Sequence, residues 1–209
     1  MTEPHAPRAR IGVLGGSFDP VHWGHLHAAL LAREAARLDA VLFVSAAAPP
    51  HKPGRSLAPD TDRLRMLSLA LVSEPRTAVS TLELREGASR YTADTLDALA
   101  REHPGVRLHF ILGVDSLIDL PGWKDPERIL SAHRVVAVDR PGFDPALIDP
   151  ELAVRCRLVT GNPMAVSATG IRERAARGLS IRHLVPGPVA DYIEERGLYG
   201  PGTPVLAAP

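Results

Sequence analysis

The sequence has a single cysteine, Cys156, among its 209 residues, and this excludes an intramolecular disulfide. It also lacks an excess of charge of either sign, because 24 lysines and arginines balance 24 aspartates and glutamates. Proteins that bind nucleic acid or membrane surfaces through charge alone usually carry a basic excess. We therefore expect neither a nucleic-acid partner nor a membrane partner.

Long apolar runs are missing as well. No stretch approaches the roughly 20 apolar residues that a membrane-spanning helix needs. The first ten residues are polar and contain two prolines, unlike the apolar core of a signal peptide. These absences predict a soluble cytoplasmic protein, with one domain over residues 1–200 and a flexible tail over 201–209.

Short apolar runs rich in β-branched residues alternate with helical patterns along the chain. The expected strands cover residues 10–14, 40–45, 78–82, 107–112, 134–138 and 157–159. The expected helices cover residues 25–38, 60–72, 92–101, 126–131, 168–177 and 188–196. This alternation predicts an α/β fold, with a doubly wound, Rossmann-like parallel sheet, helices on both faces and a small helical C-terminal part. Such sheets bind ligands at the carboxyl ends of their strands.

The segment GGSFDPVHWGH, residues 15–25, connects the first expected strand to the first expected helix. It is neither of the two common glycine-rich phosphate loops. It nevertheless offers glycines, the Ser17 hydroxyl and the pair His22 and His25 at a helix start, where N–H groups and the helix dipole attract anions. The alternatives are a tight turn with exposed histidines, or a metal site formed with His27, although no acidic or cysteine ligand accompanies them at a usual spacing.

The segment VSATGIR, residues 166–172, opens a later expected helix. Ser167 or Thr169 is suited to capping that helix. Arg172 lies three residues after Thr169 and therefore shares its helix face, from which its guanidinium reaches an anion at the N-terminus. A surface salt bridge is the alternative role for Arg172.

A glycine and an aspartate follow the fourth expected strand in LGVDS, residues 112–116. This order puts the Asp115 carboxylate at the carboxyl edge of the sheet, where ribose hydroxyls are natural partners, or where it caps the short helix that follows. Trp123 comes after a Pro-Gly turn. A loop tryptophan of this kind either stacks on a flat ligand or seals an edge of the core.

Two shorter motifs complete the set. Lys52, in PPHK, is either a mobile charge near a phosphate or an exposed lysine in the Pro/Gly-rich loop 46–57, which we expect to close over substrate. Thr92, in SRYT, is expected to cap a helix over residues 93–101, whose first N–H groups suit a small carboxylate.

These five motifs, in this order, resemble the bacterial nicotinate-mononucleotide adenylyltransferase family. The resemblance runs from about residue 10 to residue 199. The segment 15–25 and the Ser-x-Thr-x-x-Arg helix start are typical of the wider superfamily marked by His-x-Gly-His. The PPHK, Tyr-Thr and Gly-x-Asp-Ser motifs, Trp123 and the pattern over residues 184–199 narrow it to this member.

The resemblance implies transfer of an adenylyl group from ATP, used with Mg²⁺, to nicotinate mononucleotide, with nicotinate adenine dinucleotide and pyrophosphate as products on the way to NAD. It implies catalytic roles for His22, His25 and Arg172, and no metal ligands from the protein. The residues it implies for ATP binding are Gly15, Gly16, Ser17, Phe18, Gly24, Gly113, Asp115, Ser167, Ala168 and Thr169. The residues that the resemblance implies for mononucleotide binding are Lys52, Tyr91, Thr92 and Trp123.

The sequence departs from the family pattern at two positions. Ala168 stands where some relatives have a serine, so a phosphate contact there is left to the backbone N–H. Ser17 replaces a common threonine and keeps the hydroxyl. Three alternatives stay open: nicotinamide mononucleotide or another phosphate monoester as the acceptor, and a non-catalytic nucleotide-sensing module. Homo-oligomerisation is open too.

Overall fold

The structure, a computed structural model, describes residues 9–47 and 57–200. Lys52, most of the expected loop 46–57 and the expected tail 201–209 lie outside the described residues. Among the helices within these ranges, none is both long enough and apolar enough to cross a membrane.

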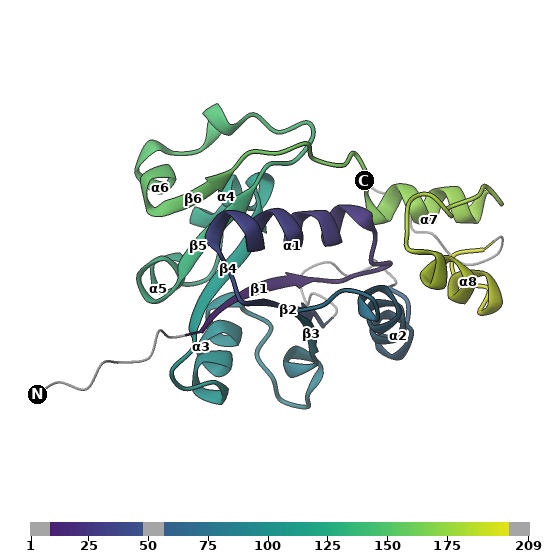
Figure 1. Cartoon of the computed structure of the whole chain (residues 1–209), viewed down its shortest axis with the longest axis horizontal. Coiled ribbons are helices and arrows are strands. Elements are labelled where there is room, and N and C mark those ends of the chain that lie inside the picture. Colours follow the sequence, from purple (N-terminus) through teal and green to yellow (C-terminus); the bar gives the residue numbers. More distant parts are fainter. Residues whose placement is uncertain (1–8, 48–56, 201–209) are drawn as a thin grey trace, which may run out of the picture.

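The core of the fold is a parallel sheet of six strands in the order β3-β2-β1-β4-β5-β6, as Figure 1 shows. The strands are β1 (Arg10–Gly16), β2 (Ala40–Ser45), β3 (Thr77–Ser80), β4 (Arg107–Gly113), β5 (Arg134–Val138) and β6 (Cys156–Val159). This order confirms the predicted doubly wound, Rossmann-like architecture.

Helices connect the strands and extend the chain beyond β6. The α-helices are α1 (Trp23–Ala36), α2 (Asp60–Leu71), α3 (Thr92–Glu102), α4 (Val114–Asp119), α5 (Pro126–Ala132), α6 (Pro150–Arg155), α7 (Ala168–Ala176) and α8 (Gly187–Glu195). Short 3₁₀ turns are η1 (Leu82–Leu84), η2 (Leu120–Gly122) and η3 (Pro145–Leu147).

The sequence prediction was wrong at two places in this order. The third strand ends at Ser80, because Leu82 already begins η1. Helix α6 was not predicted, although its start carries a recognisable signal: Pro150 is its first residue and the Asp149 side chain accepts a hydrogen bond from the Glu151 N–H at 2.8 Å.

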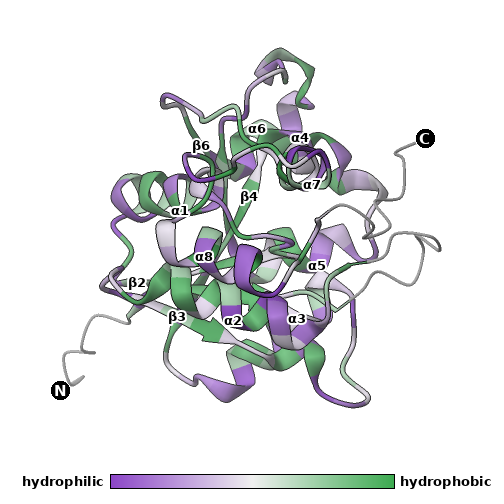
Figure 2. Ribbon diagram, turned by 90° about the vertical axis from the view of Figure 1, so that its right-hand side faces the viewer, coloured by the Kyte–Doolittle hydropathy of each residue, from purple (hydrophilic) through white to green (hydrophobic). Residues whose placement is uncertain are grey.

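Both faces of the sheet are buried, which explains why the strands are continuous apolar runs. Because side chains alternate along a strand, successive residues enter different cores. One core contains Leu14, Phe43, Ile111 and Val136 with apolar residues of α1, α2, α7 and α8. The other contains Val13, Val44, Phe110 and Ala137 with residues of α3, α4, α5 and α6. In Figure 2 the helices carry both hydrophilic and hydrophobic residues, as two-sided covering layers should.

Strand β1 occupies the point at which the winding reverses. It pairs with β2 on one side, as in Gly16 with Ser45, and with β4 on the other, as in Leu14 with Ile111. The connections from β1 and β4 therefore leave the sheet on opposite faces, and a crevice opens at the carboxyl ends of these strands. Helix α8 packs on α2, where the Tyr192 hydroxyl donates to Asp62 Oδ1 at 2.6 Å.

Candidate active site

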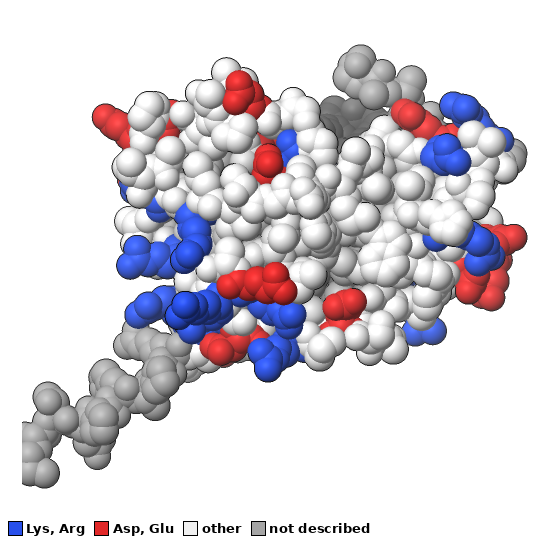
Figure 3. All heavy atoms as spheres, turned by 45° about the horizontal axis from the view of Figure 1, so that its top comes forward, with Lys and Arg blue, Asp and Glu red and all other residues white. Residues whose placement is uncertain are grey.

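A cavity of about 460 Å³ lies at the carboxyl ends of β1, β4 and β5. Its walls come from the end of β1, the first turns of α1 and α3, the end of β4, the segment after β5 and the turn before α5. Of the expected site residues, Gly15, Gly16, Ser17, His22, Gly24, His25, Thr92, Gly113 and Trp123 line it. In Figure 3 the face shown carries acidic and basic groups around a broad uncharged middle.

His22 and His25 lie against each other at the start of α1. Their ring centroids are 3.7 Å apart and the rings are nearly parallel, with an interplanar angle of 23°. The backbone N–H of His22, the N-cap residue of α1, donates to His25 Nδ1 at 3.3 Å. Because Nδ1 accepts, the proton of a neutral His25 ring resides on Nε2.

Both histidines are held in the neutral form. Burial lowers the pKa of His22 to about 4, and the positive charge of Arg140 adds to this effect. Burial also lowers the pKa of His25 well below its usual value, with further contributions from His22 and Arg140. At neutral pH the pair therefore presents N–H donors and no positive charge.

His27 does not join this pair. Its Nε2 lies 3.1 Å from the backbone carbonyl of Asn162, on the segment before α7. Over residues 9–47 and 57–200, no group of three or more histidine, cysteine or acidic side chains is arranged to hold a metal ion.

Gly24 and Gly15, both in the segment 15–25, leave space for different groups: Gly24 for the His22 ring and Gly15 for a ligand. At Gly24, a Cβ would stand 3.0 Å from His22 Nδ1, so this glycine makes room for the ring of its neighbour. At Gly15, no described atom lies within 4 Å of the position of a Cβ, although the residue lines the cavity. The backbone at Gly15 is therefore open to close approach by a ligand.

Phe18 and Arg63 support the loop between β1 and α1 from inside. Phe18 is completely buried, with its ring edge-on to His25 at 5.0 Å, and it does not belong to the cavity wall. Its side chain supports His25, and its expected part in ATP binding stays a prediction. The Arg63 guanidinium, also completely buried, donates to the Ser17 carbonyl at 2.6 Å and to Ser45 Oγ at 3.3 Å. Sequence analysis missed Arg63, because nothing in α2 distinguishes it from a surface arginine.

Asp115 lies beside the cavity rather than in its wall. Its Oδ2 accepts from Arg140 Nη1 at 2.7 Å, and its buried Oδ1 has no hydrogen-bond partner in the described part of the chain. A Cβ on Gly113 would stand 2.3 Å from this Oδ1, so Gly113 provides the clearance that was expected of it. Gly113 is itself the N-cap residue of α4 and Asp115 makes no capping bond, which removes the alternative role.

Arg172 joins the start of α7 to the loop after β1. It is 8% exposed, and its Nη1 donates to the backbone carbonyl of Asp19 at 2.7 Å while Nη2 donates to Thr169 Oγ1 at 3.1 Å. It shares a helix face with Thr169 as predicted, and its guanidinium bridges this first turn of α7 to the loop after β1. The predicted contact of Arg172 with an anion stays a prediction. Ser167 caps α7 by accepting from the Gly170 N–H at 3.1 Å, as predicted.

The start of α7 borders the cavity through Val166. Over the described ranges, the cavity wall does not include Ser167, Ala168 or Thr169, although Val166 immediately precedes them. An elongated ligand that extends past Val166 would meet the N–H groups of this helix start.

Trp123 and the start of α3 together form another part of the cavity wall. Trp123 lines the cavity and packs on Phe110, with ring centroids 6.2 Å apart. Thr92 is the first residue of α3 and Tyr91 is its N-cap, so the expectation that Thr92 caps the helix was wrong by one residue. The Tyr91 side chain is exposed and does not belong to the cavity wall, which leaves the contribution of this turn to its backbone.

Four charged residues of the cavity wall were not among the predicted site residues: Glu83, Arg90, Asp139 and Arg140. Arg140 follows β5 at the carboxyl edge of the sheet, and this position is a signal that was available. Glu83, in η1, accepts from Thr95 Oγ1 at 2.8 Å, and burial raises its pKa. No local pattern marks Glu83, because it reaches the cavity only through the packing of η1 against α3.

Comparison with known proteins places these residues in context. The cytidylyltransferase-like family matches residues 13–174. A protein of Geobacter metallireducens is 41% identical over 91% of this chain and 98% of its own length, and one of Roseiflexus is 43% identical over 91% and 98%; each is named "Probable nicotinate-nucleotide adenylyltransferase". The nicotinic acid mononucleotide adenylyltransferase of Plasmodium falciparum, solved with NaAD, has the same fold, with a TM-score of 0.76, 20% identity and coverage of 91% and 97%.

Proposed function

The chain belongs to the cytidylyltransferase-like family and, within it, to the nicotinate-nucleotide adenylyltransferases, and from this premise we propose that it transfers the adenylyl group of ATP to nicotinate mononucleotide. A phosphate oxygen of the mononucleotide attacks the α-phosphorus of ATP, the bond from the α-phosphorus to the bridging oxygen breaks, and pyrophosphate leaves. The observation that carries the proposal is one cavity that joins the His22/His25 pair to Trp123.

The chemistry needs charge stabilisation more than a base. The attacking phosphate monoester is largely ionised near pH 7, because its second pKa is about 6. Catalysis then depends on in-line positioning and on donors directed at the charge that develops around the α-phosphorus. His22 and His25, kept neutral by burial, are such donors, and in His25 the donor is Nε2–H.

The adenosine half of ATP is assigned to the end of β4. Asp115 Oδ1, buried and without a partner in the described residues, is suited to accept from a ribose hydroxyl, and Gly113 leaves it room. Arg140 holds the other oxygen of the same carboxylate and thereby fixes its orientation.

The leaving phosphates are assigned to the backbone N–H groups at Ser167, Ala168 and Thr169, next to Val166 in the cavity wall. Arg172 fixes this helix start against the loop that carries Ser17 and the histidines. Its contribution to catalysis is then positioning of the two phosphate-binding segments relative to each other.

The mononucleotide is assigned to the part of the cavity wall formed by Trp123 and the start of α3. Trp123 supports the pyridine ring by stacking, and the first N–H groups of α3 at Thr92 receive its carboxylate. Lys52, outside the described residues, is proposed to neutralise charge near the reacting phosphates.

The family acts with a divalent cation, and we propose Mg²⁺ carried by the ATP phosphates. The part of the chain described has no cluster of three or more acidic, histidine or cysteine side chains for a cation, which fits an ion that enters with the nucleotide and keeps most of its water. Such an ion neutralises the β- and γ-phosphates of the leaving group. We further propose that residues 1–200 form one domain, since apolar residues of α7 and α8 share a core with those of α1 and α2. A cytoplasmic location is a separate proposal.

The test is pyrophosphate release from ATP with a panel of phosphate-monoester acceptors. We expect turnover with nicotinate mononucleotide and a lower kcat/KM with nicotinamide mononucleotide, because helix N–H donors suit a carboxylate and match an amide NH₂ poorly. Equal or higher efficiency with the amide would reassign the acceptor. Binding of nucleotide without pyrophosphate release from any acceptor would indicate the sensing module instead.

A further inference from the structure

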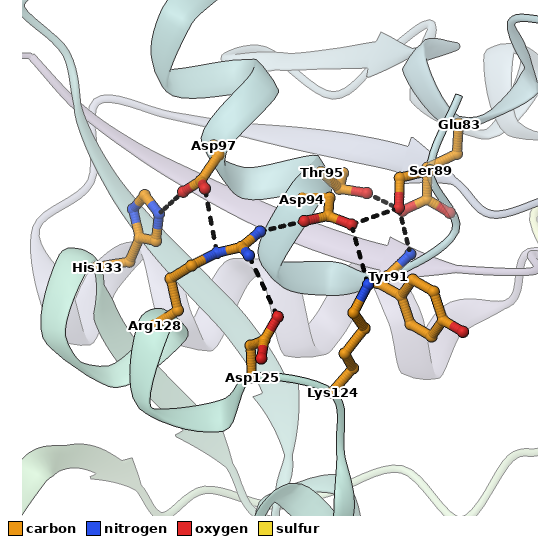
Figure 4. A network of polar contacts seen from close by, with 10 residues as sticks. All are labelled: Glu83, Ser89, Tyr91, Asp94, Thr95, Asp97, Lys124, Asp125, Arg128 and His133. Carbon is orange, nitrogen blue, oxygen red and sulfur yellow. Dashed lines mark hydrogen bonds and ion pairs between the residues drawn. The ribbon is translucent and has the colours of Figure 1, made fainter. Parts of the chain in front are cut away.

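Arg128, on α5, joins α5 to α3 through two carboxylates. Its guanidinium pairs with Asp94 through Nη2 and with Asp97 through Nε at 3.1 Å from Oδ2, as Figure 4 shows. Its Nη1 also lies 3.2 Å from Oδ2 of Asp125, at the start of its own helix. One partly exposed arginine therefore connects two helices and the turn that precedes one of them.

The network extends to the turn that begins α3. Ser89 Oγ donates to Asp94 Oδ2 at 2.7 Å and accepts from the Tyr91 N–H at 3.3 Å. Lys124 Nζ lies 3.9 Å from the same Asp94 Oδ2 and 4.2 Å from the centre of the Tyr91 ring. These contacts fix the backbone just before Thr92, whose N–H is one of the proposed carboxylate donors.

The same network fixes the position of Trp123. The Trp123 N–H donates to the Leu120 carbonyl at 3.0 Å on one side, and Lys124 and Asp125, both in the network, follow it on the other. Trp123 and Thr92 line the same cavity from segments about 30 residues apart in the printed sequence. Arg128 links the two helices that follow these segments through its ion pairs with Asp94 and Asp97 of α3.

The ion pair between Arg128 and Asp94 also changes the charge that a ligand meets at the start of α3. Asp94 is the third residue of α3, where its negative charge opposes the attraction of the helix N-terminus for an anionic ligand. Hydrogen bonds from Ser89 and Arg128 lower the pKa of Asp94 and keep it ionised. Arg128 and Lys124 neutralise this carboxylate from the side of α5, and the N–H groups of α3 are left for the ligand.

We propose that Arg128 is a positioning residue of the acceptor half of the site. It holds Trp123 relative to the start of α3 and masks Asp94, so that the site selects a mononucleotide whose ring carries a carboxylate over one whose ring carries an uncharged amide. This inference rests on the proposed function. Arg128 touches neither substrate in this arrangement and acts through Asp94 and the Trp123 turn.

The first test compares Arg128→Gln with Arg155→Gln. Arg155 makes a bidentate pair with Glu127 of the same helix α5, at 2.7 and 2.8 Å, and is therefore a matched control for loss of an exposed ion pair. We expect Arg128→Gln to raise KM for nicotinate mononucleotide about tenfold and to leave KM for ATP within about twofold. Arg155→Gln should leave both unchanged. Equal behaviour of the two variants, or equal shifts for both substrates, overturns the proposal.

The second test separates masking from simple loss of structure. Arg128→Gln and Asp94→Asn both break the pair, but only the first leaves a carboxylate at the helix start, with Lys124 at 3.9 Å as its remaining cationic neighbour among the described contacts. The preference for nicotinate over nicotinamide mononucleotide, as a ratio of kcat/KM values, should fall in Arg128→Gln and persist in Asp94→Asn, and Arg128→Lys should restore part of it. A preference that falls alike in Arg128→Gln and Asp94→Asn overturns the masking role.

A third measurement needs no substrate. In a Trp23→Phe background, Trp123 is the remaining tryptophan, because the sequence contains two. Arg128→Gln should increase acrylamide quenching of Trp123 fluorescence, whereas Arg155→Gln should not; unchanged quenching overturns the positioning role. If wild-type protein releases no pyrophosphate with any pyridine mononucleotide, the proposed function fails, and this is distinct from an active enzyme in which Arg128→Gln behaves like the control.

Discussion

The Arg172 guanidinium donates to the backbone carbonyl of Asp19, 153 residues earlier in the chain, at 2.7 Å. The two residues belong to the two segments that carry the phosphate-binding assignment. A second contact, from Arg172 Nη1 to Asp19 Oδ2 at 3.7 Å, places a positive charge beside a completely buried carboxylate. The Tyr199 hydroxyl donates to Asp19 Oδ1 at 2.6 Å, so the end of the described chain joins the same cluster.

Replacing Arg172 by glutamine should therefore affect folding as well as catalysis. Loss of the guanidinium removes the hydrogen bond to the Asp19 carbonyl and the positive charge beside the buried Asp19 carboxylate, which keeps the hydroxyl of Tyr199 as a donor. We expect the free energy of unfolding to fall by about 3 kcal/mol in urea titrations. Arg174→Gln is the matched control, because Arg174 lies on the same helix and donates to the exposed Ser180 carbonyl. Equal stability of the two variants would contradict the structural role of Arg172.

His25→Ala should lower kcat about 10²–10³-fold, as does loss of one preorganised donor to developing charge. Because His25 Nδ1 accepts from the His22 N–H, the active donor is Nε2–H. Glutamine extends an amide nitrogen toward that position and asparagine does not, so His25→Gln should keep more activity than His25→Asn. Steady-state kinetics check the order, and circular dichroism controls for folding. The reverse order would assign the donor to the other nitrogen.

Gly24→Ala tests the space that the signature glycine provides. The added Cβ would stand 3.0 Å from Nδ1 and 3.1 Å from Cε1 of His22 and push this ring out of the stack with His25. We expect kcat to fall about tenfold, while stability changes by less than about 1 kcal/mol because alanine favours the helix. Gly187→Ala is the control, at a helical glycine with no described atom near the Cβ position. Full activity of Gly24→Ala would show that the ring position is not critical.

Trp123→Ala should raise KM for the mononucleotide about tenfold or more, since stacking on an aromatic ring contributes about 1–3 kcal/mol per base. KM for ATP should stay within about twofold, because Trp123 is assigned to the mononucleotide and the ATP contacts are assigned to other residues. Initial rates with each substrate varied in turn give both constants. Equal increases in the two constants would mean that Trp123 only supports the core through Phe110.

Stability should fall with acidification in a way that depends on His22. Its pKa is about 4 in the folded protein and 6.5 without the fold, so the unfolded chain binds more protons between these values and stability decreases as pH falls from about 6.5 toward 4. His22 alone should account for about 2 kcal/mol between pH 7.5 and pH 5. Urea midpoints of wild type, His22→Gln and the exposed control His183→Gln measure it. An equal slope in all three proteins would contradict neutral burial of His22.

Much of the candidate site could be predicted from residues that lie close together in the sequence. The glycines of residues 15–24, the two histidines, the Ser167 cap and the Gly113–Asp115 pair are each defined by neighbours a few residues away, and parallel strands bring their carboxyl ends to one edge. Local order did not give the partner of Arg172, the burial of Phe18, or the arrival of Glu83 in the cavity wall. Each of these depends on a contact between distant segments.

The sequence by itself thus determined the alternation of strands and helices, the place of the ligand site and the family to which the chain belongs, because these follow from periodicity and from short motifs at strand ends. Only the tertiary structure decided which charged groups face each other. A motif marked Arg172 in the sequence, but no local pattern showed that Arg172 supports the loop after β1, that Arg140 orients Asp115, or that Arg128 joins α5 to α3. Long arginine side chains reach several neighbouring elements, and the packing of those elements selects the partner.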